Sequence, residues 1–398
     1  MRIGCTILGS LFKIGGYQVF TYNLLSQLSE RGHYVKLYVT KSEYLENELL
    51  YSSLSFDVGP VDYLHPYLTR FAPHLCRRQM LKVQKRDQMD VWQIVGAYPA
   101  GYLSSSLSNE APIVLRTHGE DLQIDAGLGY GLRLDPSINR RVISTLKAFN
   151  KVIAMTSSMS ETYESLGVKK EHIETIPNGV DYSRLSATSD DEKTITRKQF
   201  GVELDIPLLL TVGRHHPKKG YELIPLIANR VKEQGITFKW LVIGNNVSRI
   251  SELVKKHDVG DSVKLIEEIK PPFNQQNFLL PSQQLVDIYQ TADLFVFPSF
   301  IEGFPRVIIE AMAASLPIIT TDADGCREVV DNCITGLISE KGNDSIMAAN
   351  IVRMLCDDEL RQRLSLGAAE YSKAYDWPHI VDRYENLYLS LTNSDHSN

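Results

Sequence analysis

The feature that most constrains the fold is an alternation of short apolar runs with helical stretches, which occurs twice along the chain. In the first half, residues 17–31 place Phe20, Leu24 and Leu28 at helical spacing, and Gly32 suits the end of that helix. The strand-like runs of this half lie at 2–8, 35–40, 91–97, 112–118 and 151–157. Strands that alternate with helices in this way predict a doubly wound parallel sheet.

A polar and charged stretch interrupts this alternation, which then restarts. We interpret residues 184–206 as the linker region between two domains, together with a surface helix. The strand-like runs of the second half lie at 207–214, 238–245, 262–268, 292–299, 317–322 and 336–339. The domains are therefore predicted at 1–183 and 207–376, followed by a C-terminal helix and tail at 377–398 that can pack on either domain.

The expected fold class is α/β, with two facing Rossmann-like domains, each built on a doubly wound parallel sheet. Ligands of such sheets bind beyond the carboxyl ends of the strands. The cleft between the two domains is therefore the expected site of function.

Composition excludes several classes of protein. The chain has 398 residues, which suits two domains, and a net charge of −6, which gives no global attraction to nucleic acid. It has no apolar run of about 20 residues, so we expect no membrane span. Its five cysteines form no CxxC pair, which is typical of reduced thiols in the cytoplasm. The absence of GxGxxG after the first strand, of GxxxxGK[ST] and of HExxH argues against a dinucleotide dehydrogenase, a P-loop kinase and a zinc protease.

The strongest motif is the stretch 297–330, in which Glu302 and Glu310 are separated by seven residues. An apolar strand ends before a turn, and Pro305 suits the first position of the helix that follows. The free amides around Gly303 and Phe304 at that helix start would form an anion site for a phosphate. Glu310 lies in an apolar helical stretch, where a buried carboxylate needs hydrogen-bond donors, and a ribose diol supplies two. Glu302, in the turn, would lie closer to the sugar.

This stretch closely resembles the Glu-x7-Glu signature of the retaining glycosyltransferases of the GT-B fold, family 4 (glycosyltransferase group 1). The resemblance implies that Glu310 holds the donor ribose and that Glu302 contacts the transferred sugar; Arg306 joins the candidate donor-binding residues. The chain has Pro305 where the family often has glycine before the helix, and Ser315 where it often has glycine before LPII. A purely structural role for the two carboxylates is the alternative.

A second motif, TVGRHHPKKG at 211–220, combines cations with a strand end. The Arg214 fork and the Lys219 point charge can converge on a diphosphate and stabilise a leaving nucleotide without a metal ion. The family resemblance covers the same residues and places the active lysine just before Gly220, so Lys219 is preferred to Lys218. The alternative is a solvated basic loop.

Two strand-end loops of the first half are candidates for the same site. Gly15 and Gly16 precede a helix, where backbone amides can approach a ligand closely, although paired glycines also form simple turns. His118 ends a strand-like run, and the family carries a histidine at the matching position near the donor sugar. A structural histidine is the alternative. Asp121, like Arg116, is a weaker candidate that would support the site from behind.

Three further positions are weaker candidates. Asn178 lies in PNGVD, which resembles the family's hinge-side turn and for which we prefer a structural role. Asp322 and Asp324 form a DxD, which binds a metal ion in a different transferase fold, but here they match the family's donor loop, which needs no metal. Glu328 is expected to fix that loop or to touch the nucleotide.

A basic stretch at 63–86 contains six Arg or Lys residues and no acid. Leu64, Tyr67, Leu68 and Phe71 follow helical spacing, so the stretch could lie as an amphipathic helix on an anionic membrane surface. A solvated helix over the first domain is the alternative. Relatives in the family often use lipid-linked acceptors, which favours the membrane hypothesis.

The sequence therefore predicts a retaining glycosyltransferase that needs neither cofactor nor metal ion. It would move a sugar from a nucleotide-diphosphate donor to a glycan or lipid-linked acceptor, which enters from the first domain, in surface polysaccharide or lipopolysaccharide synthesis. We expect a cytoplasmic protein, peripheral at the inner face of the membrane, and no nucleic-acid partner. A nucleotide-sugar epimerase of similar fold and a non-catalytic partner subunit are the alternatives.

Overall fold

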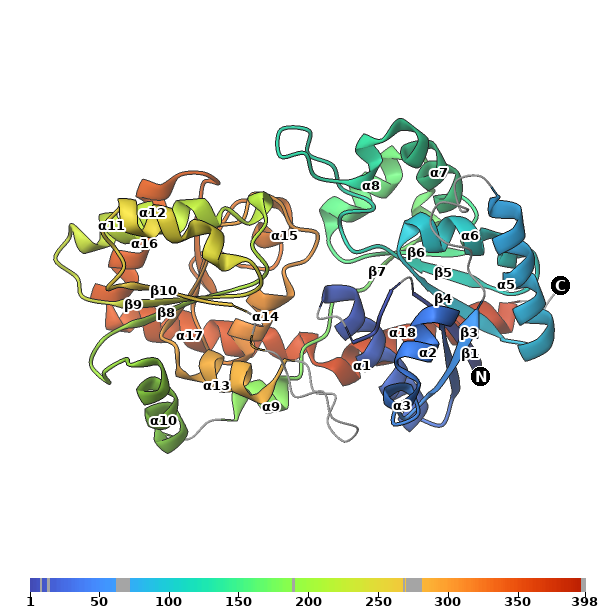
Figure 1. Ribbon diagram of the computed structural model, residues 1–398, viewed down its shortest axis with the longest axis horizontal. Coiled ribbons are helices and arrows are strands. Elements are labelled where there is room, and N and C mark those ends of the chain that lie inside the picture. Colours follow the sequence, from blue (N-terminus) through green and yellow to red (C-terminus); the bar gives the residue numbers. More distant parts are fainter. Residues whose placement is uncertain are drawn as a thin grey trace. The chain divides into compact units, whose positions relative to one another are not determined.

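The computed structural model describes residues 1–7, 9–12, 15–61, 72–187, 190–267, 269 and 281–394, and these fall into two compact units (Figure 1). The N-terminal unit contains Met1–Asn178 and the final helix, which begins at Trp377. The C-terminal unit takes the described residues from Gly179 to Asp376. The predicted α/β fold class is confirmed for each unit, because each is a parallel sheet flanked by helices.

The described residues of the N-terminal unit form a seven-stranded, fully parallel sheet. Its strands are β1 (Arg2–Thr6), β2 (Tyr34–Thr40), β3 (Asp57–Val61), β4 (Val91–Val95), β5 (Ile113–Arg116), β6 (Lys151–Ala154) and β7 (Ile173–Thr175). Their order in the sheet is β3-β2-β1-β4-β5-β6-β7. The helices are α1 (Gly16–Glu30), α2 (Lys41–Glu46), α3 (Glu48–Tyr51), α5 (Pro73–Asp87), α6 (Tyr102–Ser104), α7 (Pro136–Leu146), α8 (Ser157–Ser165) and α18 (Trp377–Ser394).

The described residues of the C-terminal unit form a six-stranded parallel sheet with the order β10-β9-β8-β11-β12-β13. Its strands are β8 (Leu208–Val212), β9 (Lys239–Ile243), β10 (Val263–Ile266), β11 (Leu294–Phe297), β12 (Ile318–Thr321) and β13 (Gly336–Ser339). The helices are α9 (Tyr182–Ser186), α10 (Asp190–Phe200), α11 (Ile224–Lys232), α12 (Ser251–Lys256), α13 (Gln283–Thr291), α14 (Arg306–Ala313), α15 (Asp324–Arg327), α16 (Asp344–Cys356) and α17 (Asp358–Ser372). The two sheets thus share one winding pattern, with the first strand of each near the middle.

All six strands predicted in the second half are present, and the first half has two more than predicted. β3 contains Gly59 and Pro60, and β7 has only three residues. Both are edge strands. An edge strand tolerates proline and needs no continuous apolar run, because one of its sides is unpaired, so neither strand shows the buried pattern used for the prediction. The segment expected as a linker, 184–206, contains the end of α9 and all of α10, within the C-terminal unit.

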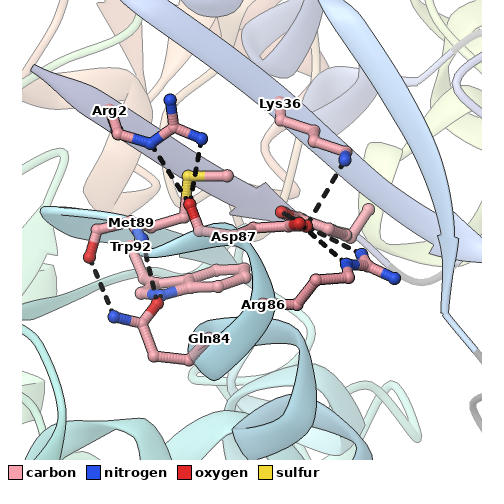
Figure 2. Close-up of polar contacts among 8 residues, drawn as sticks. Arg2, Lys36, Gln84, Arg86, Asp87, Met89 and Trp92 are labelled. Carbon is pink, nitrogen blue, oxygen red and sulfur yellow. Dashed lines mark hydrogen bonds and ion pairs between the residues drawn. The ribbon is translucent and has the colours of Figure 1, made fainter.

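Helix α5 is fixed to the N-terminal sheet at its carboxyl end (Figure 2). The Asp87 carboxylate accepts two hydrogen bonds from the Arg86 guanidinium, both 2.7 Å, and one from Lys36 Nζ at 3.3 Å. Arg2 donates to the Asp87 carbonyl at 2.9 and 3.2 Å. Gln84 accepts from the Trp92 indole at 2.8 Å and so ties the last turn to β4. The basic helix therefore has a well-defined orientation on its sheet.

The final helix belongs to the N-terminal unit, although it follows the C-terminal unit in sequence. Arg31, after α1, forms ion pairs of 2.6 and 2.7 Å with Asp382 and Glu385 of α18. The Tyr388 hydroxyl donates to Gln93 Oε1 of β4 at 2.7 Å. The chain consequently passes between the units twice, after Asn178 and before Trp377.

Candidate donor-binding site

The central feature of the C-terminal unit is a buried carboxylate shared by two lysines. Lys219 Nζ contacts Glu302 Oε1, and Lys218 Nζ lies 3.7 Å from Glu302 Oε2. The Ser299 hydroxyl donates to Glu302 Oε1 at 2.9 Å. Lys219 Nζ also lies 4.8 Å from the centroid of the Phe297 ring. Two lysine cations and one serine hydroxyl therefore surround one carboxylate at the carboxyl ends of β8 and β11.

The loops after β8 and β11 are joined by their backbones, which sets this geometry. Lys218 O accepts from Phe300 N at 2.7 Å and from the Ser299 hydroxyl at 3.0 Å. Gly220 has φ +65°, and a Cβ there would lie 2.1 Å from Pro298 O. Only glycine fits this approach, so the KKG sequence follows directly from the packing of the two loops.

The charges of this cluster shift the pKa values of its members. Burial would raise the pKa of Glu302, but Lys218 and Lys219, with hydrogen bonds from Lys219 and Ser299, outweigh burial and lower it. Burial also lowers the pKa of Lys219, and Lys218 adds to this effect, while Glu302 opposes it. Two lysine cations share one carboxylate, so the carboxylate is stabilised in its charged form. The single negative charge does not neutralise both lysines, and the cluster keeps a net positive charge. Such a cluster is suited to accept a further anion.

The second carboxylate of the motif, Glu310, lies on α14 and is 3% exposed. Its Oε2 accepts from the Tyr289 hydroxyl at 3.0 Å, and its Oε1 lies 3.2 Å from Arg306 Nε, one turn earlier on the helix. The helix begins at Arg306 rather than at Pro305, which precedes it with φ −80° and ψ 85°. Proline therefore stands one position outside the helix, not at its first residue as predicted.

The turn between the two carboxylates is buried and close to the loop after β12. Glu302, Gly303, Phe304 and Pro305 are all buried. Gly325 N donates to Glu302 O at 3.2 Å, and a Cβ on Gly325 would lie 2.5 Å from that oxygen. The DADGC loop therefore supports the turn through a glycine that no larger residue could replace without moving it.

The other predicted residues of this unit lie in the loops after β8 and β12. Arg214 follows β8, is exposed, and has no ion pair or side-chain hydrogen bond within the described part of the chain. Glu328 ends α15, and its amide donates to Asp324 O at 3.3 Å. Asp322 accepts from Lys341 N at 2.9 Å, and Asp324 pairs with Arg327 at 2.8 Å. In the described ranges, no three His, Cys, Asp or Glu side chains are grouped as a metal ion would require.

A hollow of about 490 Å³ in this unit lies elsewhere, near the amino ends of β11 and β12. Ala292, Ala314 and Arg361 are among its lining residues. Neither carboxylate of the motif lines it, and neither do Arg214 and Lys219.

The predicted residues of the N-terminal unit gather around the loop after β5. The His118 ring packs against Phe20, with 5.7 Å between centroids, and against Tyr17 at 6.0 Å. Asp121 Oδ1 accepts from His118 N at 3.0 Å, and Asp121 Oδ2 accepts from Ala97 N at 2.6 Å. Burial raises the pKa of Asp121, although its backbone donors oppose this. Asp121 thus fixes the His118 loop to the loop after β4 through these two backbone amides.

The glycine loop and Asn178 also lie in this unit. Gly15 precedes α1 in an extended conformation, and Gly16 is the first residue of the helix. A Cβ on Gly16 would meet no atom within 4 Å, whereas one on Gly15 would meet the Gln18 side chain at 2.4 Å. Asn178 is buried, and its Oδ1 accepts from Arg116 Nη2 at 2.5 Å. Ile14, the first residue of the glycine motif, lies outside the described residues.

Sequence reasoning missed two residues that hold the carboxylates. Ser299 could have been found from its place at the end of β11, three residues before Glu302. Tyr289 lies on α13, 21 residues before Glu310, and no sequence pattern links the two. Lys218, predicted only as a rival to Lys219, lies near the same carboxylate.

Comparisons with known proteins agree with this architecture. The family described as Glycosyltransferase Family 4 matches residues 14–184, and the one described as Glycosyl transferases group 1 matches residues 192–371. N-acetyl-alpha-D-glucosaminyl L-malate synthase of Bacillus anthracis is 25% identical, over 99% of this chain and 98% of its own length. Sucrose-phosphate synthase from Thermosynechococcus elongatus has a TM-score of 0.78 at 18% identity, covering 99% of this chain and 100% of that one. Anabaena Alr3699/HepE in complex with UDP has a TM-score of 0.79 at 18% identity, covering 98% and 100%.

Proposed function

This chain belongs to the GT-B glycosyltransferases, with a family 4 N-terminal region and a group 1 C-terminal region, and we propose that it is a retaining, metal-independent enzyme. It would transfer a sugar from a nucleotide-diphosphate donor to a glycan or lipid-linked acceptor. The observation that carries the proposal is the buried Glu302 carboxylate between Lys218 and Lys219, eight residues before a second buried carboxylate, Glu310, on α14.

The donor diphosphate is proposed to bind Lys219 and Arg214, with the amides of Gly303 and Phe304 and the loop at Gly15 and Gly16 as further donors. Lys219 is partly buried and shares its carboxylate with a second cation, so an added phosphate improves its electrostatic environment. Arg214 is exposed and makes no described ion pair, so its planar fork can turn toward a phosphate without breaking one.

Glu310 is proposed to hold the ribose. Its carboxylate is oriented by the Tyr289 hydroxyl and by Arg306, so it needs no rearrangement to accept hydrogen bonds from two ribose hydroxyls. Glu302 and His118 are proposed to orient the transferred sugar, while Asp121, Asn178 and Glu328 support the loops around it.

Retention is proposed to occur by attack on the face from which the phosphate leaves. The acceptor oxygen bonds to the anomeric carbon as the bond from that carbon to the phosphate oxygen breaks, and the leaving phosphate takes the acceptor's proton. A covalent route would need a carboxylate nucleophile within reach of that carbon. Glu302 is occupied by two lysines, which lower its nucleophilicity. Isolation of a glycosyl-enzyme ester on any Asp or Glu would overturn this step.

Nucleotide binding and sugar transfer test the function together. UDP is the first nucleotide to try, because the Anabaena neighbour is described in complex with it; GDP and ADP follow. We expect a thermal shift with one of the three, transfer from the matching nucleotide sugar in the presence of EDTA, and an unchanged anomer by NMR. Conversion of the donor without an acceptor to another nucleotide sugar would favour an epimerase, and no shift with any nucleotide would favour a non-catalytic subunit.

A lysine pair provides a matched control for the diphosphate contact. Lys219→Met should abolish the nucleotide shift, because the cation proposed to bind the diphosphate is lost. Lys264 of β10 also lies over a phenylalanine ring, 5.7 Å from the Phe200 centroid, but its side chain is exposed, so Lys264→Met should retain the shift. Equal shifts in both variants would contradict the assignment of Lys219.

The exposed face of α5 is proposed to contact an anionic membrane surface at the inner face of the cell membrane. Arg78, Lys82 and Lys85 are exposed at helical spacing, whereas Met80 and Val83 are buried on the opposite face. A cluster of lysines and arginines on one helix face attracts anionic lipid. Residues 63–71 of the predicted stretch, with Leu64, Tyr67, Leu68 and Phe71, lie outside the described residues.

Vesicle sedimentation tests this contact. Within the described ranges, no helix is both long and apolar enough to cross a membrane. We expect retention on anionic vesicles at low salt and loss of retention in Arg78→Glu/Lys82→Glu. The control Lys255→Glu/Lys256→Glu makes the same change in net charge on α12 and should bind like the wild type. Failure of the wild type to sediment with anionic vesicles at low salt would remove the membrane proposal.

A further inference from the structure

Arg116, the last residue of β5, is a fully buried cation with no counter-ion among the described residues. Its side chain is 0% exposed. Within the described part of the chain, no carboxylate oxygen lies within 4.0 Å of its guanidinium nitrogens. Burying an unpaired charge is costly, and a buried arginine normally has a carboxylate partner. The cost of burying this cation beside the His118 loop suggests that its contacts have a role in the protein.

The guanidinium is held instead by neutral oxygens and an aromatic ring. Arg116 Nη1 donates to Ile176 O at 3.3 Å and to the Tyr384 hydroxyl, and Nη2 donates to Asn178 Oδ1 at 2.5 Å. The guanidinium carbon lies 4.0 Å from the centroid of the Phe20 ring. The planar fork of arginine can make these contacts at once, whereas the single ammonium of lysine could not.

These partners mark the two places where the chain leaves and re-enters the N-terminal unit. Ile176 and Asn178 are the last residues before the first crossing, and Tyr384 lies on α18, which begins directly after the second. One side chain therefore joins both crossings on the side of this unit. Within the C-terminal unit, Val180 N donates to Tyr375 O at 2.8 Å, so the same two segments remain paired beyond Arg116.

The other end of this contact network is His118. Phe20 has the guanidinium of Arg116 against its ring, and its centroid lies 5.7 Å from that of His118. Arg116 also precedes His118 by only two residues in the chain. Its contacts thus reach the histidine through the backbone and through the Phe20 ring.

We propose that Arg116 is a positioning residue for sugar transfer: it fixes the two chain crossings and the Phe20 ring as one rigid group, and thereby fixes the orientation of His118. The inference rests on the proposed function, because it takes His118 to face the transferred sugar. Arg116 itself touches no substrate. Its loss therefore lowers the rate of transfer and leaves nucleotide affinity unchanged, because the residues proposed to bind the phosphates and ribose most tightly lie in the C-terminal unit.

The variant Arg116→Met tests the proposal, since methionine fills part of the space without the fork. We expect kcat to fall by about 10- to 100-fold at a temperature well below the unfolding midpoint, which is the cost of a misplaced catalytic group. The Kd for the nucleotide, measured by titration calorimetry, should stay within about twofold of the wild type, because the proposed nucleotide-binding residues of the C-terminal unit are unchanged. Arg197→Met is the matched control. Arg197 is also buried, donates to Ile206 O at 2.8 Å and pairs with Asp293, but lies in α10 of the other unit. It should lower the unfolding midpoint without lowering kcat.

A milder pair of variants covers the case in which Arg116→Met does not fold. Tyr384→Phe removes one acceptor of Arg116, whereas Tyr388→Phe, one turn later on α18, removes a hydrogen bond to Gln93 instead. Both tyrosines are fully buried, so similar losses of stability are expected, but only Tyr384→Phe should lower kcat. Equal kcat values in the two variants, or a folded Arg116→Met with wild-type kcat, would overturn the inference. If the wild type neither binds a nucleotide nor transfers a sugar, the proposed function fails first, and this inference falls with it.

Discussion

Asp121 and Glu302 are two buried carboxylates in strand-end loops of similar sheets, and their surroundings differ in one respect. Asp121 is 6% exposed and Glu302 is 5% exposed. Asp121 accepts from two backbone amides, and burial raises its pKa. Glu302 is contacted by two lysines and a serine hydroxyl, and its pKa is lowered.

The difference separates a structural carboxylate from one suited to bind ligands. Backbone amides cannot move away from Asp121, so its contacts define a fixed loop. Lysine side chains are long and carry a full charge, so those around Glu302 can also attract an incoming phosphate. The surroundings of a buried acid, more than its burial, are therefore the reason for proposing that the Glu302 loop faces the donor.

The largest effect is expected when Glu302, the carboxylate proposed to orient the sugar, loses its charge. Glu302→Gln should lower kcat by about 100- to 1,000-fold, the usual cost of removing one group that stabilises a transition state. The affinity for UDP, or for the nucleotide that binds, should stay the same or increase, because both lysines keep their charge and lose their internal partner. Steady-state transfer and calorimetry check the two halves. A fall in nucleotide affinity as large as the fall in kcat would place Glu302 at the phosphates rather than the sugar.

The same substitution at the structural carboxylate should mainly affect stability. Asn in place of Asp121 can accept at only one oxygen, so either Ala97 N or His118 N is left facing an amide group. We expect Asp121→Asn to lose roughly 1–3 kcal/mol of unfolding free energy, the cost of one buried unsatisfied donor. Urea denaturation measures the loss. A fully stable variant would show that the loop is held by other contacts.

Asp87 sharpens the comparison, because it is a carboxylate with cation partners far along the sequence from the donor motifs. Arg86, the Tyr38 hydroxyl, which donates to Asp87 Oδ2 at 2.6 Å, and Lys36 lower its pKa. The contacts of Asp87 with Arg86 and Lys36 are drawn in Figure 2. The stabilisation is present above the pKa of an unfolded aspartate, about 3.9, and is lost as the pH falls toward the lower folded value. At pH 7, Asp87→Asn should cost roughly 1–2 kcal/mol of unfolding free energy, reduced by the solvent exposure of Arg86. Denaturation at pH 7 and pH 3 should show the difference from wild type shrinking at the lower pH, whereas a constant difference would contradict the ionic origin.

The smallest effect is expected at Tyr289, which orients the second carboxylate of the motif. Tyr289→Phe removes one hydrogen bond to Glu310, worth about 1 kcal/mol. The KM for the donor should therefore rise about fivefold with little change in kcat, because ribose binding contributes equally to the ground and transition states. Tyr221→Phe is a suitable control, since this equally buried tyrosine donates to Gly213 O instead. A rise in KM in both variants would indicate a general loss of packing.

Much of the fold was predictable because it depends on local pattern. The six strands of the C-terminal unit and five of the N-terminal unit follow from short apolar runs bounded by turns, which reflect burial on both faces of a sheet. The edge strands β3 and β7 were not predictable in this way, since half of their surroundings is solvent or loop. The start of α14 was off by one residue, because the conformation of Pro305 is set by the loops packed around it.

The sequence by itself determined which residue types stand at the ends of the central strands, because the spacing of Glu302 and Glu310 and the KKG turn are properties of adjacent residues. Only the tertiary structure decided which of them meet. It brought Lys218, Lys219 and Ser299 to one carboxylate, joined Tyr289 to Glu310 across 21 residues, and returned α18 to the N-terminal unit. It also buried Arg116 with no counter-ion among the residues that the structure describes, which no pattern in β5 suggests. These contacts depend on how strands and helices that are distant in sequence pack together. Local sequence patterns do not specify which distant residues will be in contact.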